Sequence, residues 1–459
     1  MTTPVRRSGG LAALVIALLV AACGSPTLTP SPAATPGASP SASAAPSASG
    51  GASMQPSPSA AAAACDPNAP VESAPVPSSD ANDPNAAVYT GVEGQVSALR
   101  GITATKPVAR GVFDKAALCA YITASFREDN PAALVTATED LYRALLLIPA
   151  DVSLEDLYIE LLTSQVAGLY NDKTKTMFVV STTGEIGPVE KITYAHEYTH
   201  ALQDQKFGLR AYVGDAKDQG DRTIARTAVV EGDATLLMSL WAQQHLTPQE
   251  LGEVAATSDP AAQAVLDRMP AILKDSLLFP YTSGLQLALG AYQRAGGYAG
   301  VDALFADGPG TTEQILHPEK LVAHEAAKVV AFPASFPASL GDGWKVSLQD
   351  TLGEFQLEIL LRDAAGSKAS NDAAAGWGGD RVALVEGPGG ANAVVLDTAW
   401  DSDADATEFA GALADYVARL KAAGRSAGIL VPAPDRVVVI SASDADTLGR
   451  VANVLGLAG

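Results

Sequence analysis

Apolar residues recur at helical spacing between residues 114 and 162. The pattern runs through residues 114–126, 131–147 and 154–162, with apolar positions three or four residues apart. This period is that of an amphipathic helix, which buries one stripe of its side chains. Asn130, followed by a proline, and Ser153 are start signals for the second and third runs. We therefore expect residues 84 to about 164 to form a helical scaffold.

The period changes after this scaffold. Val166–Tyr170 and Thr176–Val180 are rich in β-forming residues, and the polar segment Asn171–Lys175 separates them. This arrangement predicts a β-hairpin. Its second strand leads into a helical stretch at residues 188–207, and an exposed strand edge at that place could pair with an extended peptide. An ordinary sheet edge without a ligand is the alternative.

The remaining chain contains helical segments followed by alternating strands and helices. Helices are expected at 285–295, 301–305, 312–315 and 352–361, which would form a second lobe. Beyond Gly379, strands are expected at 381–385, 393–397, 426–431 and 436–440, and helices at 406–423 and 445–455. Gly387–Gly390 fits the turn between the first two strands. The order ββαββα predicts a small α+β module, and the fold class is α+β, mainly helical, with a small sheet and hairpin.

The N-terminus has the features of an export signal. Arg6 and Arg7 precede an apolar segment at residues 11–20, which is too short to span a membrane permanently. The segment ends in Val20-Ala-Ala-Cys23, which resembles a bacterial lipobox. That resemblance implies cleavage before Cys23, acylation of its sulfur and an extracytoplasmic protein anchored to the cell membrane by lipid. An ordinary secretory signal with an incidental cysteine is the alternative.

Composition divides the chain into four expected parts. A signal peptide at 1–23 is followed by a tether at 24–64, which contains Ala, Ser, Pro, Thr and Gly but no charged residue. A folded domain at 65–376 and the α+β module at 377–459 complete the chain. The whole sequence carries 51 acidic and 30 basic residues, a net charge of −21. This excess of acidic residues argues against a nucleic-acid partner and against basic adhesion to anionic lipid.

Two cysteines remain once Cys23 is assigned to lipid. In an exported protein, Cys65 and Cys119 are candidates for a disulfide that ties the start of the folded domain to a nearby helix. Two buried free thiols are the alternative. A catalytic cysteine is disfavoured, because neither residue lies in a motif that would lower its pKa.

The strongest chemical signal is the motif His196-Glu197-Tyr198-Thr199-His200. Pro188 suits the first position of a helix and Gly208 suits its end, so the motif is expected to be helical. Histidines four residues apart on a helix share one face, and both imidazoles can bind one zinc ion. Glu197 would then lie beside a metal-bound water. Two histidines that merely pack or cap the helix are the alternative.

A third zinc ligand is expected from the next helix, at about residues 222–244, with Asp221 as its cap. Glu231 lies there among apolar and small residues, where a carboxylate needs a cation or a metal. A buried ion pair with Arg222 or Arg226 is the alternative role for Glu231. Asp233 is the second choice of ligand. Asp204 is a candidate for orienting an imidazole from behind.

These residues resemble the gluzincin metallopeptidases, in which two motif histidines and a downstream glutamate hold one zinc ion. The phrases His196–Gln205, Thr311–Lys320 and Gly376–Arg381 also resemble predicted bacterial lipoprotein metallopeptidases of unassigned substrate. The likeness covers most of residues 150–410. It implies a zincin-like domain with Glu197 as general base. One position departs from the thermolysin-like members, which have an aspartate where this chain has Thr235, so the group that orients the histidine must come from elsewhere or be absent.

The sequence thus predicts a zinc peptidase that hydrolyses peptide bonds in a peptide or protein substrate. Hydrolysis also requires a donor for the oxyanion, and the candidates are Tyr281, expected near a helix start, and His317, next to Pro318. A buried core tyrosine and a helix-capping histidine are the ordinary alternatives for these two residues. A non-catalytic surface-binding lipoprotein with a structural metal site is a competing function, and a zinc hydrolase of non-peptide bonds is another.

Overall fold

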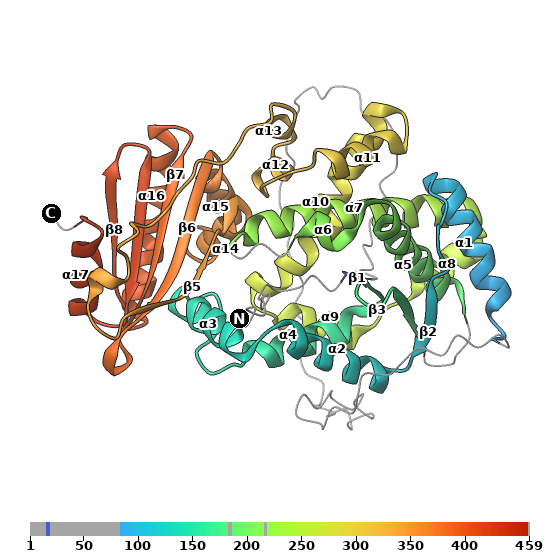
Figure 1. Cartoon of the computed structure of the whole chain (residues 1–459), viewed down its shortest axis with the longest axis horizontal. Coiled ribbons are helices and arrows are strands. Elements are labelled where there is room, and N and C mark those ends of the chain that lie inside the picture. Colours follow the sequence, from blue (N-terminus) through green and yellow to red (C-terminus); the bar gives the residue numbers. More distant parts are fainter. Residues whose placement is uncertain (1–14, 19–82, 182–185, 215–217, 458–459) are drawn as a thin grey trace, which may run out of the picture.

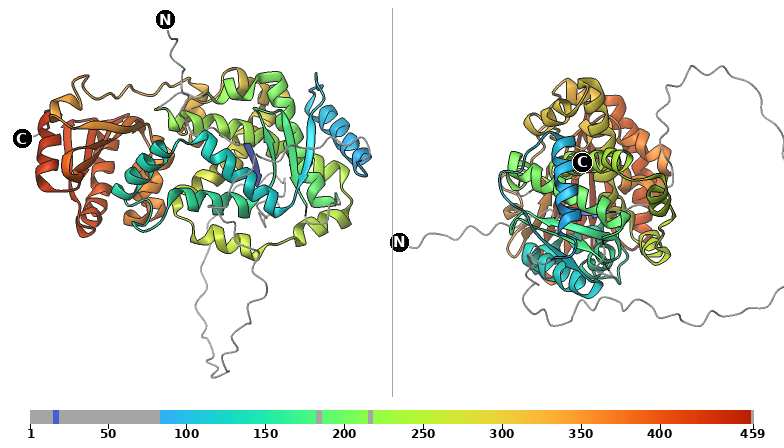
Figure 2. Two further views of the ribbon diagram at one scale, coloured as in Figure 1. Left: turned by 60° about the horizontal axis from the view of Figure 1, so that its bottom comes forward. Right: turned by 90° about the vertical axis from the view of Figure 1, so that its right-hand side faces the viewer.

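The computed structural model describes residues 15–18, 83–181, 186–214 and 218–457. It shows a mixed α+β protein that is mainly helical, which confirms the expected class. A helical body and a five-stranded C-terminal sheet lie side by side along the longest axis (Figures 1 and 2). Within the described residues, no helix is both long enough and apolar enough to cross a membrane. The expected signal peptide, apart from residues 15–18, and the tether lie outside the described residues.

The helical body contains a small mixed sheet. Its strand order is β1-β3-β4-β2, in which β3 pairs antiparallel with β1 and β4, and β2 is parallel to β4. The strands are β1 (Val15–Leu18), β2 (Ala109–Phe113), β3 (Val166–Asn171) and β4 (Thr176–Val180). The predicted hairpin β3–β4 is confirmed. The expectation of helices throughout residues 84–164 is wrong at β2, which a distant partner strand, β4, holds in an extended conformation.

The predicted scaffold helices are otherwise confirmed. Ser153 caps its helix as expected, because its side chain accepts a hydrogen bond from the backbone N–H of Asp156 at 3.2 Å. Asp114 caps the helix that follows β2 in the same way, through the N–H of Ala117 at 2.8 Å. The scaffold consists of α1 (Ala86–Arg100), α2 (Lys115–Asp129), α3 (Ala132–Ala144) and α4 (Leu154–Gln165).

The helix that carries the histidine motif is α5 (Pro188–Phe207). It begins at Pro188 and ends at Gly208, whose φ of 72° is the left-handed conformation that glycine adopts at low cost. Every residue from Ile192 to Asp204 is buried, because the helix is enclosed by β3, β4, α1 and α7 (Gly220–His245). The motif therefore lies inside the protein.

Two expectations about neighbouring helices are wrong. Asp221 does not cap α7, which begins one residue earlier; it is buried and accepts a hydrogen bond from the N–H of Thr312 at 3.1 Å. Tyr281 is not near a helix start, because α10 (Ala271–Ala295) continues through Pro280. Proline lacks the N–H of an ordinary helical residue, and the packing of α10 against α7 in a shared apolar core overrides that local cost.

Shorter helices complete the body. They are α6 (Leu209–Val213), α8 (Pro248–Ala256), α9 (Pro260–Arg268), α11 (Tyr298–Ala306), α12 (Glu313–Leu316) and α13 (Pro318–Val322). In Figure 1, α11, α12 and α13 lie along the top of the molecule, whereas α8 and α9 lie to the right and below. The helices expected at 301–305 and 312–315 correspond to α11 and α12, whereas the one expected at 285–295 is only the second half of α10.

The C-terminal part is an antiparallel sheet with helices on both faces. Its strand order is β5-β6-β7-β9-β8, and the predicted turn at Gly387–Gly390 joins β6 to β7. The strands are β5 (Lys345–Asp350), β6 (Trp377–Glu386), β7 (Asn392–Trp400), β8 (Ser426–Ala433) and β9 (Arg436–Ala442). The helices are α14 (Gly353–Ala365), α15 (Ser367–Ala374), α16 (Asp403–Ala422) and α17 (Ala445–Val454). The expected ββαββα order is confirmed, but the sheet begins at β5, well before the expected boundary at 377.

The body and the C-terminal sheet share buried surfaces. Leu141 and Leu145, in and just after α3, belong to the same apolar core as the strands β6, β7 and β9. At the start of α7, the N–H of Gly220 donates to Asp350 at 2.7 Å, and the N–H of Asp221 donates to the carbonyl of Thr351 at 3.1 Å. The C-terminal part thus accepts hydrogen bonds from the first N–H groups of α7, the helix that carries Glu231.

Candidate metal centre

Three buried side chains from α5 and α7 converge at one point. The Nε2 atoms of His196 and His200 lie 2.9 Å apart, as expected for residues one turn apart on one helix face. Oε2 of Glu231 lies 3.2 Å from Nε2 of His196 and 3.4 Å from Nε2 of His200. The structure therefore brings together all three residues that the sequence analysis selected as ligands, and this group could hold a metal ion.

The spacing and chemistry of these donors fit zinc. In a tetrahedral zinc site, donors about 2.0–2.1 Å from the ion lie about 3.3 Å from one another. The three separations in this group, 2.9, 3.2 and 3.4 Å, are close to that value. Two imidazoles and one carboxylate are also a donor set that suits zinc. Within the described part of the chain, no fourth His, Cys, Asp or Glu joins the group. A three-ligand set leaves a coordination position open, as catalytic sites require.

The alternative ion pair for Glu231 is contradicted. Arg222 donates to Gln219 at 2.9 Å, and Arg226 donates to the carbonyl of Tyr212 and lies over the Tyr212 ring. The side chains that the structure pairs with Glu231 are the two imidazoles. A carboxylate in this apolar helix is therefore compensated by the histidines.

The protonation states match this arrangement. Burial opposes the charged form of Glu231, but the two imidazoles, His200 above all, outweigh burial and lower the pKa of Glu231 to about 2. Burial also opposes charge on His200, and the opposing effect of Glu231 raises the pKa of this imidazole. At His196 burial prevails and lowers the pKa. Glu231 is therefore ionised and could serve as a ligand, and His196 is neutral with a nitrogen lone pair available.

Glu197 is buried beside the group, and one glycine makes room for it. A Cβ atom on Gly168 of β3 would lie 3.1 Å from Cγ of Glu197 and 2.5 Å from Cγ2 of Thr193. The strand can approach α5 at this point only because position 168 has no side chain. The apolar and polar pattern does not predict this role for Gly168; the signal for it in the sequence is a single glycine within a predicted strand.

The groups behind the histidines differ from those expected. Nδ1 of His200 lies 2.8 Å from Oε1 of Gln203, so an amide contacts this imidazole. Asp204, the expected orienting residue, instead accepts a hydrogen bond from Tyr170 at 2.7 Å and pairs with Lys175. Asp233, the second choice of ligand, is paired with Arg100 at 2.9 Å. The predictions for Asp204 and Asp233 are therefore wrong.

Thr235 does not replace the aspartate of the thermolysin-like pattern. Among the described residues, Oγ1 of Thr235 and Nδ1 of His196 are both buried and neither has a hydrogen-bond partner. A side-chain hydrogen bond to Nδ1 therefore orients the ring of His200, whereas Nδ1 of His196 has no such bond within the described residues.

The two oxyanion candidates lie in different places. The half-buried ring of Tyr281 is 6.1 Å from that of His196, centroid to centroid, with the ring planes inclined by 26°. His317 lies between α12 and α13, where its Nε2 is 2.9 Å from Oε1 of buried Glu354 on α14. That pairing raises the pKa of His317. The described contacts thus join Tyr281 to the His–Glu group and join His317 to a separate carboxylate.

A second carboxylate group lies near the start of α12 and already contains a cation. Glu313, Glu325 and Asp401 are close enough together to be considered for a metal, but the ammonium group of Lys320 contacts all three. Lys320 supplies the compensating positive charge, so this group needs no metal. Much of the phrase Thr311–Lys320 is therefore explained by packing between the body and the C-terminal sheet.

Only one of the three cysteines is described. Cys119, in α2, is disulfide-bonded. Cys65, its expected partner, and Cys23, the expected site of lipid attachment, lie outside the described residues.

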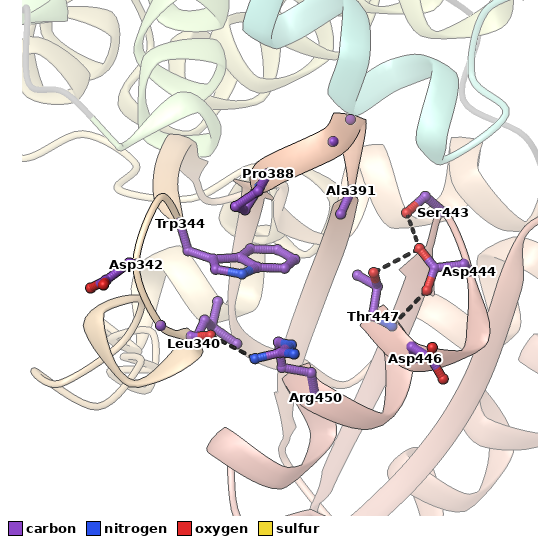
Figure 3. A pocket seen from close by; sticks show the side chains of 13 residues that line it. Leu340, Asp342, Trp344, Pro388, Ala391, Ser443, Asp444, Asp446, Thr447 and Arg450 are labelled. Carbon is purple, nitrogen blue, oxygen red and sulfur yellow. Dashed lines mark hydrogen bonds between the residues drawn. The ribbon is translucent and has the colours of Figure 1, made fainter.

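A pocket of about 560 Å³ lies in the C-terminal part, away from the His–Glu group (Figure 3). Trp344 and Arg450 line one side of it, and Asp444 lies opposite. Asp444 caps α17 through the N–H of Thr447 at 2.8 Å, and Arg450 donates to the carbonyl of Leu340 at 3.1 Å. Its lining mixes one guanidinium with three carboxylates and does not indicate a single class of ligand.

Comparison with known proteins identifies one matching family, and it covers the C-terminal part alone. Residues 344–452 match a family described as a domain of unknown function (DUF8575). This segment begins just before β5 and ends within α17, so it coincides with the five-stranded sheet and its helices. No curated protein and no solved structure matches the chain.

Proposed function

We propose that this protein is a zinc metallopeptidase that acts outside the cytoplasm and is anchored to the membrane by lipid at Cys23. The observation that carries the proposal is the triangle of donor atoms from His196, His200 and Glu231, with sides of 2.9, 3.2 and 3.4 Å. An open coordination position and the adjacent buried carboxylate of Glu197 favour catalysis over a purely structural metal.

The chain's own residues divide the chemistry between them. When bound, zinc would supply Lewis-acid polarisation of a carbonyl group and of water. Glu197 takes a proton from the attacking water and passes it to the leaving amine. Tyr281 is our preferred donor to the oxyanion, because its ring lies next to that of His196 whereas His317 is paired with Glu354.

The strand expected to offer an open edge, β4, pairs with β2 on one side and β3 on the other, so that expectation is wrong. The edge of β3 instead suggests how a substrate is held. In the structure this edge pairs antiparallel with β1, with Ala17 opposite Gly168, and Gly168 in turn adjoins Glu197. β1 belongs to the expected signal peptide, so cleavage before Cys23 would remove it and leave the edge open. An extended peptide bound there would run past Glu197 and gain main-chain hydrogen bonds that do not depend on its sequence.

The test compares wild type with Glu197→Gln and Glu231→Gln. Wild type should retain one zinc ion per chain after dialysis and should cleave unstructured peptides. Glu197→Gln keeps the shape of the side chain but cannot take a proton, so it should retain zinc and lose hydrolysis. Glu231→Gln should lose zinc.

The same measurements separate the competing functions. Equal zinc content with no peptide hydrolysis in either wild type or Glu197→Gln would reject the peptidase and favour the structural-metal or non-peptide alternatives. Full zinc retention in Glu231→Gln would mean that the third ligand has been assigned to the wrong residue.

A further inference from the structure

The amide of Gln203 is fixed at both ends inside the protein. Its Nε2 donates to the carbonyl of Val230 at 3.0 Å and to Oδ2 of Asp233 at 2.8 Å. Both partners can only accept hydrogen bonds, so the NH₂ group must face them and the amide oxygen must face His200. This oxygen lies 2.8 Å from Nδ1 of His200, which must therefore carry the proton. In the neutral imidazole the lone pair of His200 is then on Nε2, the atom that faces Glu231.

Asp233 is held in turn by Arg100. Nε of Arg100 donates to Oδ1 of Asp233 at 2.9 Å and to Oδ2 at 3.1 Å, and both side chains are completely buried. The guanidinium also lies 2.8 Å from Oδ1 of Asp302 and 4.5 Å from the centre of the Tyr298 ring. A cation fixed against a buried carboxylate compensates for the loss of water around it. Arg100 thus holds Asp233 in place behind the amide.

We propose that Arg100, Asp233 and Gln203 form a positioning relay that fixes His200 in the tautomer with hydrogen on Nδ1 and so prepares Nε2 to bind metal. The relay rests on the proposed function, because it acts on a metal ligand. It runs from the last residue of α1, through α7, to α5, and it takes the place of the carboxylate that usually orients a zinc-binding histidine directly. An amide in direct contact, with a buried anion behind it, performs the same task in two steps.

The first experiment measures zinc affinity by competition with a chromogenic chelator. Gln203→Leu replaces the amide by an apolar side chain of similar volume, so it removes both the oxygen that faces His200 and the NH₂ group that faces Asp233. It should weaken zinc binding by about 10- to 100-fold. Asp233→Asn replaces the carboxylate that accepts a hydrogen bond from the Gln203 amide, and it should also weaken zinc binding. Asp302→Asn is the matched control: it removes the other carboxylate on Arg100 without touching Gln203, and it should leave zinc affinity unchanged.

The second experiment reads the tautomer itself in the zinc-free protein. Nitrogen chemical shifts of ¹⁵N-labelled histidine, measured at a pH high enough for His200 to be neutral, should show this residue wholly in the Nδ1–H form in wild type and as a mixture in Gln203→Leu. Circular dichroism on each variant establishes that it is folded before these values are compared.

The outcomes separate the relay from the proposed function. A folded Gln203→Leu protein with wild-type zinc affinity and an unchanged tautomer would overturn the relay. Equal losses in Asp233→Asn and Asp302→Asn would show that the ion pairs only hold α1 in place, and would overturn the roles of Arg100 and Asp233. If wild type binds no zinc but its His200 tautomer depends on Gln203, the relay stands and the metallopeptidase proposal fails.

Discussion

Gly284 of α10 and Gly232 of α7 touch backbone to backbone. A Cβ atom on Gly232 would lie 2.1 Å from the carbonyl oxygen of Gly284, so neither helix can carry a side chain at this crossing. Glu231 immediately precedes Gly232, and Tyr281 lies one turn before Gly284 on α10. This close approach therefore sets the separation between the candidate third ligand and the candidate oxyanion donor.

Substituting Gly284 should disturb stability and site together. In Gly284→Ala the new Cβ would lie 2.1 Å from the carbonyl oxygen of Ala228, a backbone atom that cannot rotate away. We expect the free energy of unfolding to fall by about 1–3 kcal/mol and peptide hydrolysis to decrease. Gly290→Ala in the same helix meets only the flexible end of Arg294, and it should be neutral or stabilise by about 0.5–1 kcal/mol. Urea unfolding of both variants checks this; similar losses would exclude the close helix contact as the cause.

Gly168 should be required for the placement of Glu197. In Gly168→Ala the Cβ would collide with Cγ2 of Thr193 and press on Cγ of Glu197. We expect hydrolysis to fall at least about tenfold while zinc content stays near wild type, because a displaced general base costs rate without removing a ligand. Thr193→Ser removes the colliding methyl group and should restore part of the rate to the double variant. An unchanged rate in Gly168→Ala would contradict this role.

Gly353 should be required for the contact between α7 and the C-terminal part. It has a φ of +73°, and a Cβ there would lie 1.8 Å from Oδ1 of Asp221. Gly366, at the other end of α14, has a φ of +80° but open space around it. Both substitutions place a side chain at a positive φ, and only the one at Gly353 also meets a neighbouring side chain. Gly353→Ala should be less stable than Gly366→Ala by at least about 2 kcal/mol in thermal or urea unfolding; equal stabilities would argue against a rigid contact.

Glu358 should make stability depend on pH. Burial, reinforced by the nearby Glu354, raises the pKa of Glu358 from 4.5 to about 7. The unfolded chain loses this proton near pH 4.5 and the native protein near pH 7, so unfolding releases a proton between those values. Stability should therefore fall as the pH rises from about 4.5 to about 7, by at most about 3 kcal/mol, and be level above.

The control for this prediction is Glu358→Gln, which resembles the protonated side chain at every pH. Urea unfolding at pH 5 and pH 8 should show a smaller loss of stability in the variant than in wild type. Parallel losses in the two proteins would mean that Glu358 does not titrate in this range.

The sequence by itself determined the features that depend on near neighbours in the chain. The spacing of apolar residues predicted the scaffold helices, the hairpin β3–β4 and the ββαββα order of the last part. The two motif histidines share a face because i and i+4 positions on any helix do so. Even the inward orientation of Glu231 followed from its apolar neighbours on α7, because a lone carboxylate in such a helix needs a buried partner.

Only the tertiary structure decided which distant groups meet. Arg100 reaches Asp233 across 133 positions of sequence, and this pairing, with Gln203, replaces the orienting carboxylate that local reasoning sought at Asp204. Packing against α7 keeps Pro280 inside α10, and a distant partner strand makes residues 109–113 extended. The physical reason is that periodicity and capping act over a few residues, whereas buried hydrogen bonds and close helix contacts depend on how whole elements are arranged.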